Sequence, residues 1–343
     1  MKDDFKHKAG TLNELSEKYS LKEKATDCYI YVFNSDLILD EFFWVTDAKD
    51  ELIFDIGELT KIFTFVAFLK ICVEKHISLN SYVGELIGFF SSKGKENLTF
   101  KDLLSGSKLF EKFSPSEYLE SLYPLPRPGL LGSRTGKRAV FFELCRLEIE
   151  RDKPGSDNLN YLVLEYACEL LSSLSLDKLV NKMVTQVINN PEFGFVDFSR
   201  LSKVSLTNVN TSFIKNMVER KSPQALRECL NLGGISGFYG IVGKPSSLIQ
   251  FFKGFLKNLY APEPFLPIPL FSIAQKYDKE ESFFFFKKLG NIFSFSDAYG
   301  NTLCFQSDIS MSKPKGVLVL VKPNDACPRD DLKSFLDFAV ELF

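Results

Sequence analysis

The chain has 343 residues, of which 45% are hydrophobic, and this is enough to bury the core of one large domain or of two subdomains. Its 42 Lys and Arg residues nearly balance 44 Asp and Glu residues, for a formal net charge of −2. This balance provides no basic excess to hold nucleic acid through its phosphates, so we expect no nucleic-acid partner.

The cysteine and histidine patterns predict neither a metal site nor a cofactor site. The 7 cysteines are scattered, and no CxxC pair or Cys/His cluster has the spacing of a zinc site. An odd number of cysteines without a secretory signal fits reduced thiols in the cytoplasm, where we expect the protein. His7 and His76 lie in charged surroundings that are typical of solvated side chains. The longest apolar helix candidate, residues 62–73, contains Lys70 and is too short to span a bilayer, so no transmembrane segment is expected.

The N-terminal part predicts a helix, a hairpin and a buried helix, in that order. Thr11 and Glu14 have the spacing of a capping box and begin a helix over residues 11–24. Residues 28–33 and 37–45 are β-rich runs joined by Asn34-Ser35-Asp36, which predicts a hairpin. A short extended segment at 52–55 then leads into a helix over residues 58–75. Apolar residues surround this helix on nearly every side, which indicates a buried central helix.

The remainder alternates loops and helices before it returns to strands. Proline and glycine residues between 124 and 132 indicate an irregular loop. The other elements we expect are helices at 159–174 and 247–260, strands at 282–289, 292–295, 302–306 and 316–321, and an amphipathic helix at 328–343.

The order of these elements predicts the α+β class. Strands, a helical middle and then further strands are explained by one antiparallel sheet built from both chain ends, flanked by helices, with an inserted helical subdomain. We therefore expect a single domain over residues 1–343. Its sheet subdomain would comprise residues 26–60 and about 261–343, its helical subdomain about 61–260, and residues 1–25 would form an N-terminal tail and helix.

The segment from Leu52 to Thr64, LIFDIGELTKIFT, resembles the nucleophile segment of the penicillin-recognising serine hydrolases. In that family a strand leads through an apolar-Phe-Asp-x-Ala-Ser-x-Thr-Lys run into a buried helix. The resemblance implies that the serine attacks the substrate and that the lysine one turn later takes its proton. Here Lys61 stands in the lysine position, but Glu58 replaces the serine. Without reference to the family, a carboxylate and a lysine three residues apart predict a helical ion pair.

Two further segments resemble the same superfamily, closest to the branch of class C β-lactamases, serine esterases and D-amino-acid-processing peptidases. The run from Thr99 to Leu109, TFKDLLSGSKL, is similar to the family's Ile-Thr-Ile-x-x-Leu-Leu-Thr-His-Thr-Ser-Gly-Leu segment. The run from Leu230 to Ile241, LNLGGISGFYGI, is similar to its Gly-Gly-Val-Ala-Gly-His-Ala-Gly-Leu-Phe loop. The resemblance covers roughly residues 26 to 343 and implies a β-lactamase/transpeptidase-like fold.

The family's second catalytic motif, Tyr-Ser/Ala-Asn, has no tyrosine in this chain. The run from Lys153 to Leu164, KPGSDNLNYLVL, matches the surrounding Pro-Gly and Asn-Tyr-Leu-x-Leu pattern. Ser156 takes the place of the tyrosine, and Asn158 corresponds to the motif asparagine. Tyr161 belongs to the following helix, where we expect it to be a packing residue.

The third motif, Lys/His-Thr-Gly on an edge strand, is also replaced. In the run from Ile292 to Leu303, Phe295, Ser296 and Asp297 stand in its three positions, and only the later Gly300 is kept. The resemblance implies that a substrate carboxylate docks at this strand. Asp297 would repel such a carboxylate.

Several other patterns suggest chemistry, but each has a simpler explanation. Ser105–Lys108 and Ser92–Lys95 both spell Ser-x-x-Lys, a pattern that chance produces in a lysine-rich chain, and activation also needs a positioned base. Residues 132–137 lack the GxxxxGK[ST] pattern of a phosphate loop. The glycines of residues 233–240 are best explained as a tight backbone path.

These observations favour a catalytically inactive relative of the serine β-lactamase-like hydrolases that has a binding or structural role. Two alternatives remain open: an active esterase, D-peptidase or β-lactamase with a relocated nucleophile, and an interaction protein that uses its helical face. Glu58 and the missing tyrosine argue against the active hydrolase. The sequence names neither a ligand nor a protein partner.

Overall fold

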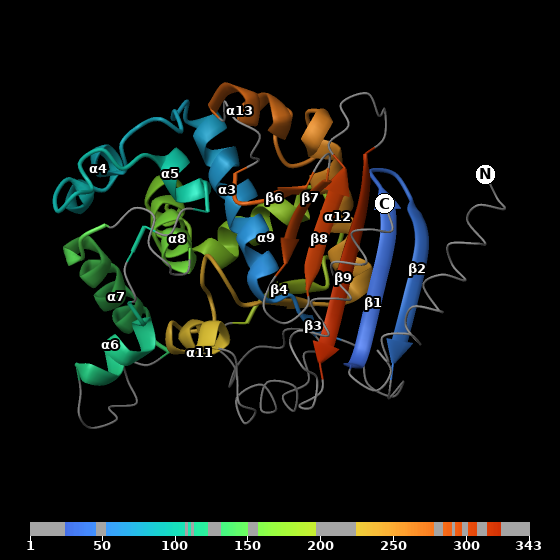
Figure 1. Ribbon diagram of the computed structural model, residues 1–343, viewed down its shortest axis with the longest axis horizontal. Coiled ribbons are helices and arrows are strands. Elements are labelled where there is room, and N and C mark those ends of the chain that lie inside the picture. Colours follow the sequence, from blue (N-terminus) through green and yellow to red (C-terminus); the bar gives the residue numbers. More distant parts are fainter. Residues whose placement is uncertain are drawn as a thin grey trace.

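The computed structural model describes residues 25–45, 53–106, 109–110, 113–122, 132–149, 157–196, 224–277, 284–289, 292–296, 301–306 and 314–323. Figure 1 shows a layer of strands with helices packed beside and behind it. This is the mixed arrangement with an antiparallel sheet that the element order predicts. The helices expected at residues 11–24 and 328–343 lie outside the described residues.

The larger sheet has six antiparallel strands in the order β2-β1-β9-β8-β7-β6. These strands are β1 (Ala25–Asn34), β2 (Ile38–Val45), β6 (Lys287–Leu289), β7 (Ile292–Ser296), β8 (Thr302–Gln306) and β9 (Lys315–Pro323). Because β1 pairs with β9 along its length, segments from both ends of the described chain lie side by side, as expected.

The predicted hairpin between β1 and β2 is confirmed, and a side chain defines its turn. The Asn34 Oδ1 atom accepts hydrogen bonds from the backbone N–H groups of Asp36 and Leu37, each at 2.8 Å. An asparagine side chain that binds the backbone two and three residues ahead replaces part of the turn's own hydrogen bonding. Asn34-Ser35-Asp36 therefore forms the turn that the sequence indicated.

A second, three-stranded sheet was not predicted. It consists of β3 (Phe54–Asp55), β5 (Ile241–Gly243) and β4 (Phe193–Phe195), in the order β3-β5-β4. The expected strand at 52–55 therefore pairs away from the large sheet. The reason is local: the chain turns directly after Asp55, and Gly57 with φ +57° begins the 3₁₀ helix η1 (Gly57–Leu59).

The buried helix expected at 58–75 is α3 (Thr60–Glu74), which packs against α8 and α9. Twelve of its residues are buried, including Thr60, Lys61 and Thr64, so it forms the centre of the molecule. The other helices are α4 (Val83–Leu86), η2 (Gly88–Phe90), α5 (Phe100–Leu104), α6 (Pro115–Ser121), α7 (Arg134–Arg146), α8 (Asn158–Ser172), α9 (Leu176–Thr185), α11 (Gln224–Asn231), α12 (Pro245–Tyr260) and α13 (Leu270–Tyr277).

Helix α12 packs against strands β1 and β9, although the sequence placed it in the helical subdomain. Its Phe255 ring meets the Phe305 ring of β8 edge to face, with centroids 6.0 Å apart. On its other side, Phe251 stacks on Phe63 of α3 at 3.6 Å. Helix α12 thus joins the sheet to the central helix, and the exact division into subdomains stays a prediction.

The strand expected at 282–289 is shorter in the structure. Strand β6 comprises only Lys287–Leu289, while Phe284, Phe285 and Phe286 are buried at 4%, 8% and 3% exposure. Their side chains pack between the sheet and the helices instead of alternating across a strand, because consecutive aromatic residues all find apolar contacts there.

The described residues contain no helix that is both long and apolar enough to cross a membrane. The six cysteines among them are buried free thiols. Burial raises the pKa of Cys28 and of Cys72 to about 12, which makes these thiols poor nucleophiles near neutral pH.

The glycine-rich loop of residues 233–240 confirms the prediction of a tight backbone path. A Cβ atom at Gly237 would lie 2.1 Å from the backbone oxygen of Tyr161, far inside van der Waals contact. Gly240 has φ +116°, and a Cβ there would lie 2.3 Å from the Gly234 oxygen. The missing side chain at Gly237 therefore lets the loop pass against α8, and the one at Gly240 lets the loop fold back on itself.

We expect Gly237→Ala to lower the free energy of unfolding by about 1–3 kcal/mol or more, because the added methyl group must displace backbone. Gly88→Ala is the matched control, since a methyl group added at Gly88 would have no neighbouring atom within 4 Å among the described residues. Urea unfolding of both variants checks this. Equal stability of the two variants would contradict the close approach of the loop to α8.

Candidate functional site

The site expected from the sequence lies where η1 leads into α3. Glu58 is in η1, and its Oε2 atom lies 2.7 Å from the Nζ atom of Lys61. The predicted ion pair between these two residues is therefore present. The side chain of Lys61 is only 1% exposed, whereas that of Glu58 is 23% exposed. The ammonium group is thus almost completely removed from water.

A second carboxylate, which the sequence did not indicate as a partner, completes the site. The Oδ1 atom of Asp157 lies 2.6 Å from Lys61 Nζ, and its side chain is 18% exposed. Asp157 is the N-cap residue of α8, but its side chain makes no capping hydrogen bond. An aspartate at this position usually binds the helix's own N–H groups. The one sequence feature that could have pointed to Asp157 is its place directly before Asn158 in the Pro-Gly-Ser-Asp-Asn run.

The two carboxylates keep Lys61 protonated. Burial alone would lower its pKa, because a charged ammonium loses its hydration. The negative charges and hydrogen bonds of Asp157 and Glu58 outweigh burial, so the pKa of Lys61 lies above its ordinary value of 10.5. A general base must instead be neutral near the working pH.

Aromatic rings cover the remaining sides of this ammonium. The ring centroids of Tyr161 and Phe295 lie 5.5 and 5.7 Å from Lys61 Nζ. Tyr161 is fully buried, as a packing residue should be. Its pKa is raised well above 10.0 by burial first and by Asp157 and Glu58 in addition, so its hydroxyl is no substitute for a catalytic base.

Phe285 joins the helical part to the sheet at this point, and we call Phe285 and Phe295 together the aromatic plug. The ring of Phe285 meets that of Tyr161 edge to face at 5.7 Å and that of Phe295 at 5.1 Å. A Cβ atom at Gly106, just after α5, would lie 3.3 Å from Phe285. The plug therefore fills the space between α8, the end of α5 and strand β7.

The other expected site residues are only partly brought together. Asn158 is buried at the start of α8, directly after Asp157. Ser296 ends β7, where it is exposed and pairs with Thr302 of β8. Ser156 and Asp297 lie outside the described residues.

Strand β7 was expected at the edge of the sheet, but β6 pairs with part of it. The pairs run from Leu289–Ile292 to Lys287–Ser294, so β6 stops short of Phe295 and Ser296. The two residues in the third motif's positions therefore extend past the end of β6, beside η1. The strand expected at 282–289 is thus present as β6 in shortened form, and its pairing with β7 was not predicted.

Asp55 fixes the turn that carries Glu58. Its Oδ1 atom accepts a hydrogen bond from the Gly57 N–H at 2.9 Å, and its Oδ2 atom accepts one from the Tyr239 hydroxyl at 2.7 Å. Its backbone oxygen accepts a third from the Asn301 side chain at 3.0 Å. Burial raises its pKa from 3.8 to about 6, although the bonds to Gly57 and Tyr239 lower it in part.

The described part of the chain offers little support for a relocated nucleophile. The Ser105 hydroxyl donates to the Asp102 backbone oxygen at 2.8 Å. The Lys95 ammonium donates to the backbone oxygen of Leu147, and Lys95 meets Ser92 only through a backbone hydrogen bond from its N–H to the Ser92 carbonyl oxygen at 3.2 Å. Burial lowers the pKa of Lys95, but a base without a hydroxyl beside it activates nothing. No cluster of three or more His, Cys, Asp or Glu side chains that could hold a metal ion occurs in the described residues.

We predict that Lys61→Met lowers the free energy of unfolding by about 3–5 kcal/mol, because it leaves two close carboxylates without their cation. Double-mutant cycles of Lys61→Met with Glu58→Gln and with Asp157→Asn should each show coupling. The exposed pair Lys244–Glu192, with Nζ and Oε1 2.6 Å apart, is the matched control and should contribute about 0–1 kcal/mol. Additive effects in both Lys61 cycles would show that this charge cluster does not form.

Asp55 should make stability depend on pH. Its pKa is raised on folding, so its contribution is complete below 3.8 and is lost as pH rises through about 6. Between about pH 5 and about pH 7.5 this single group should lower the free energy of unfolding by about 1.4 kcal/mol. Urea unfolding of wild type and Asp55→Asn across this interval measures the difference. Parallel pH profiles for the two proteins would refute the assignment.

Comparisons with known proteins identify the fold. No family model matches the chain, and no curated protein matches it by sequence. A penicillin-binding protein homologue from Pyrococcus abyssi aligns with a TM-score of 0.60 at 16% identity, over 97% of this chain and 77% of its own. The penicillin-binding protein from Bacillus halodurans aligns at 0.58 and 13%, over 96% and 99%. The hydrolase EstCE1, which has promiscuous acyltransferase activity, aligns at 0.60 and 11%, over 98% of both chains. The chain therefore has the fold of the β-lactamase and penicillin-binding-protein-like serine hydrolases.

Proposed function

We propose that this protein is a catalytically inactive relative of the β-lactamase-like serine hydrolases and acts through binding or as a structural component. The observation that carries the proposal is the ammonium group of Lys61, enclosed between the carboxylates of Glu58 and Asp157 at 2.7 and 2.6 Å. In the fold family, the equivalent lysine would have to accept a proton from a serine.

The lack of a hydroxyl nucleophile and of a neutral base among the groups around Lys61 supports this proposal. A protonated Lys61 has no lone pair with which to take a proton, and Glu58 supplies no hydroxyl group. If the Glu58 carboxylate itself attacked an amide or ester, the product would be an anhydride, which is a poor intermediate. Tyr161 cannot act as the base either, because its raised pKa keeps the phenol protonated.

Access to the site is also restricted. The aromatic plug occupies the space between α8 and β7, next to Lys61. A substrate that approached from the position of the third motif would have to displace Phe295, and Phe285 supports that ring edge to face. This packing of aromatic rings next to Lys61 favours a stabilising role for these residues.

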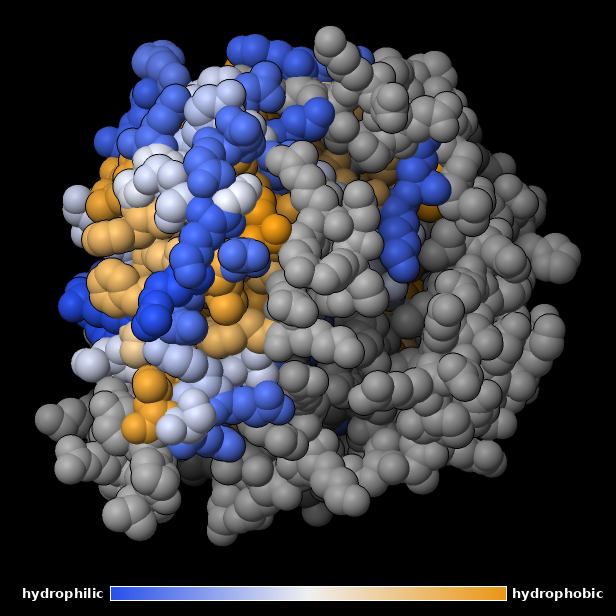
Figure 2. All heavy atoms as spheres, turned by 60° about the vertical axis from the view of Figure 1, so that its left-hand side comes forward, coloured by the Kyte–Doolittle hydropathy of each residue, from blue (hydrophilic) through white to orange (hydrophobic). Residues whose placement is uncertain are grey.

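The helical side of the molecule supports a binding or structural role. Figure 2 shows this side, where apolar side chains are exposed between hydrophilic ones. Phe89 and Phe142 are 63% and 49% exposed, and their rings meet edge to face at 5.8 Å. Aromatic residues are enriched in protein interfaces, so an exposed aromatic pair is compatible with contacts to another molecule.

We expect no covalent adduct when the protein is incubated with a fluorescent penicillin or a fluorophosphonate probe. Glu58→Ser should also stay unlabelled, because Asp157 still holds Lys61 in its charged form. The variant Glu58→Ser/Asp157→Asn removes both carboxylates and should also remain unlabelled or nearly so, because the aromatic plug remains and the other catalytic groups are absent.

Intact-mass spectrometry provides the measurement, with a catalytically active serine hydrolase of this fold as the positive control. A stoichiometric adduct on any serine of the wild-type protein would overturn the proposal and establish the active-hydrolase alternative. Rapid labelling of Glu58→Ser alone would show that Lys61 can act as a base, and would contradict the role given to Asp157.

A further inference from the structure

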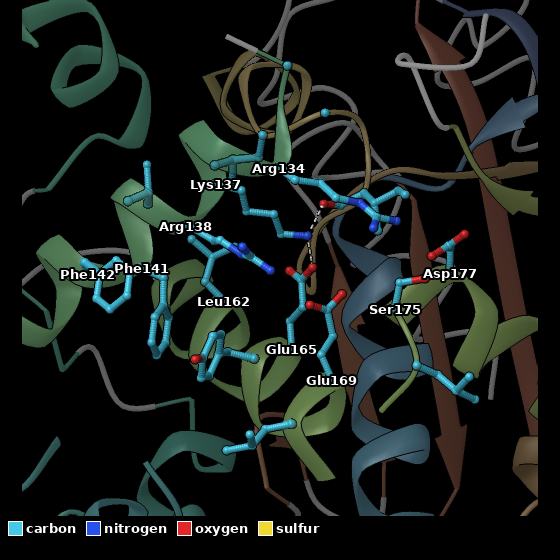
Figure 3. Close-up of a pocket in the computed structure, with 18 of the residues that line it drawn as sticks. Arg134, Lys137, Arg138, Phe141, Phe142, Leu162, Glu165, Glu169, Ser175 and Asp177 are labelled. Atoms are coloured by element: carbon cyan, nitrogen blue, oxygen red, sulfur yellow. Dashed lines mark hydrogen bonds and ion pairs between the residues drawn. The ribbon is translucent and has the colours of Figure 1, made fainter. Parts of the chain in front are cut away.

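A pocket of about 530 Å³ lies in the helical part of the molecule, away from Lys61. It is formed by α7, the second half of α8, the start of α9 and the beginning of the glycine-rich loop (Figure 3). None of the residues found around Lys61, namely Glu58, Asp157, Tyr161 and Phe295, lines it. Its volume is within the range of pockets that hold small molecules.

Charges of opposite sign face each other across this pocket. In Figure 3 the cations Arg134, Lys137 and Arg138 come from α7, while the carboxylates of Glu165, Glu169 and Asp177 come from α8 and α9. We call these two sides the α7 wall and the α8–α9 wall. Residues 134, 137 and 138 share one face of α7 because they are three and four positions apart.

One buried ion pair holds the two walls together. Lys137 Nζ binds the carboxylate of Glu165 and also donates to the backbone oxygen of Ile235 at 3.0 Å. Glu165 in turn accepts a hydrogen bond from the Gly237 N–H at 2.9 Å, and its side chain is only 2% exposed. This network fixes α7, α8 and the glycine-rich loop relative to one another, so the pocket is preformed.

Most of the other polar groups of the walls lack a partner among the described residues, although Glu169 accepts a hydrogen bond from the Leu176 N–H at 3.0 Å. Arg134 and Arg138 form no ion pair or hydrogen bond with any described residue, and both are exposed. On the opposite wall, the buried atoms Ser175 Oγ and Asp177 Oδ1 have no hydrogen-bond partner in the described part of the chain. Buried polar atoms without partners are costly, which indicates that something else satisfies them.

The rest of the lining is apolar and aromatic. The rings of Phe141 and Tyr166 stack with their centroids 3.7 Å apart and their planes inclined by 11°. Leu162, Leu170 and Leu174 complete this part of the lining. A ligand that fits must therefore combine an apolar body with at least two charged groups.

We propose that this pocket binds a small zwitterion with apolar side chains, of the size of a dipeptide or tripeptide. The carboxylate of the ligand would pair with Arg134 and Arg138 on the α7 wall. Its ammonium group would pair with Glu169 and Asp177 on the α8–α9 wall, where Ser175 Oγ can also accept a hydrogen bond. The apolar side chains would contact the ring of Phe141. This site is independent of the proposed inactivity at Lys61.

Isothermal titration calorimetry on the full chain tests the proposal with the dipeptides Leu-Phe, Phe-Leu and Val-Leu. Each is compared with its N-acetyl form, which lacks the ammonium, and with its C-terminal amide, which lacks the carboxylate. We expect the free dipeptides to bind and each capped form to bind at least about tenfold more weakly, which corresponds to about 1.4 kcal/mol. The absence of measurable binding by any free dipeptide at millimolar concentration would overturn the proposal.

Variants locate the binding. Arg138→Gln and Asp177→Asn should each weaken binding of the free dipeptides at least about tenfold. Arg134→Gln tests the second arginine of the α7 wall in the same way. Arg146→Gln is the matched control, because Arg146 is on α7 but outside the pocket, with its side chain 77% exposed. Under conditions in which the Lys61→Met variant is folded, it should bind the free dipeptides as the wild type does. Binding that is insensitive to the wall variants, or equal for free and N-acetylated peptides, would contradict a zwitterion site.

Discussion

The buried charge of Lys61 is the constraint around which this part of the structure is organised. An ammonium group that is 1% exposed in the centre of the molecule would be too costly to bury alone. The chain compensates it twice, once from η1 through Glu58 and once from the start of α8 through Asp157. These two contacts connect the central helix to its preceding turn and to a helix that lies 96 residues further along the chain.

The same arrangement that stabilises the fold keeps Lys61 from acting as a general base. A lysine can serve as a base only if its pKa falls toward neutrality, and burial alone would favour this. Two carboxylates reverse the direction of the shift. The aromatic plug packs beside this cluster, with Phe285 in contact with both Tyr161 and Phe295. The position of Glu58 beside Lys61 thus fits a structural ion cluster.

A second ion pair, Lys137–Glu165, also involves helix α8 but has a different setting. It ties α7 to α8 and to the glycine-rich loop, and it lies at the wall of an open pocket instead of under aromatic rings. Helix α8 therefore contributes an acid to each of two separate charged sites, Asp157 at its first turn and Glu165 two turns later. At the first the ammonium is only 1% exposed, and the second lines a pocket of about 530 Å³.

The sequence predicted the features that depend on local pattern. The hairpin at Asn34, the buried helix α3 and the ion pair between Glu58 and Lys61 follow from turn chemistry, apolar periodicity and helical spacing. It did not predict Asp157 as a partner of Lys61, the three-stranded sheet through β3 or the pocket at α7. Each of these depends on residues that only the tertiary fold brings together, such as Asp157 and Lys61 or Lys137 and Glu165.

The protonation state of Lys61 is the most direct test of this account. Nuclear magnetic resonance of protein labelled at the lysine side chains can follow the Cε and Nζ signals of Lys61 through a pH titration, with Lys61→Met used to assign them. With both carboxylates in place, we expect Lys61 to stay charged through neutral pH and to titrate above its ordinary pKa of 10.5. A titration of Lys61 near neutral pH would contradict it, because such a lysine would be available as a general base.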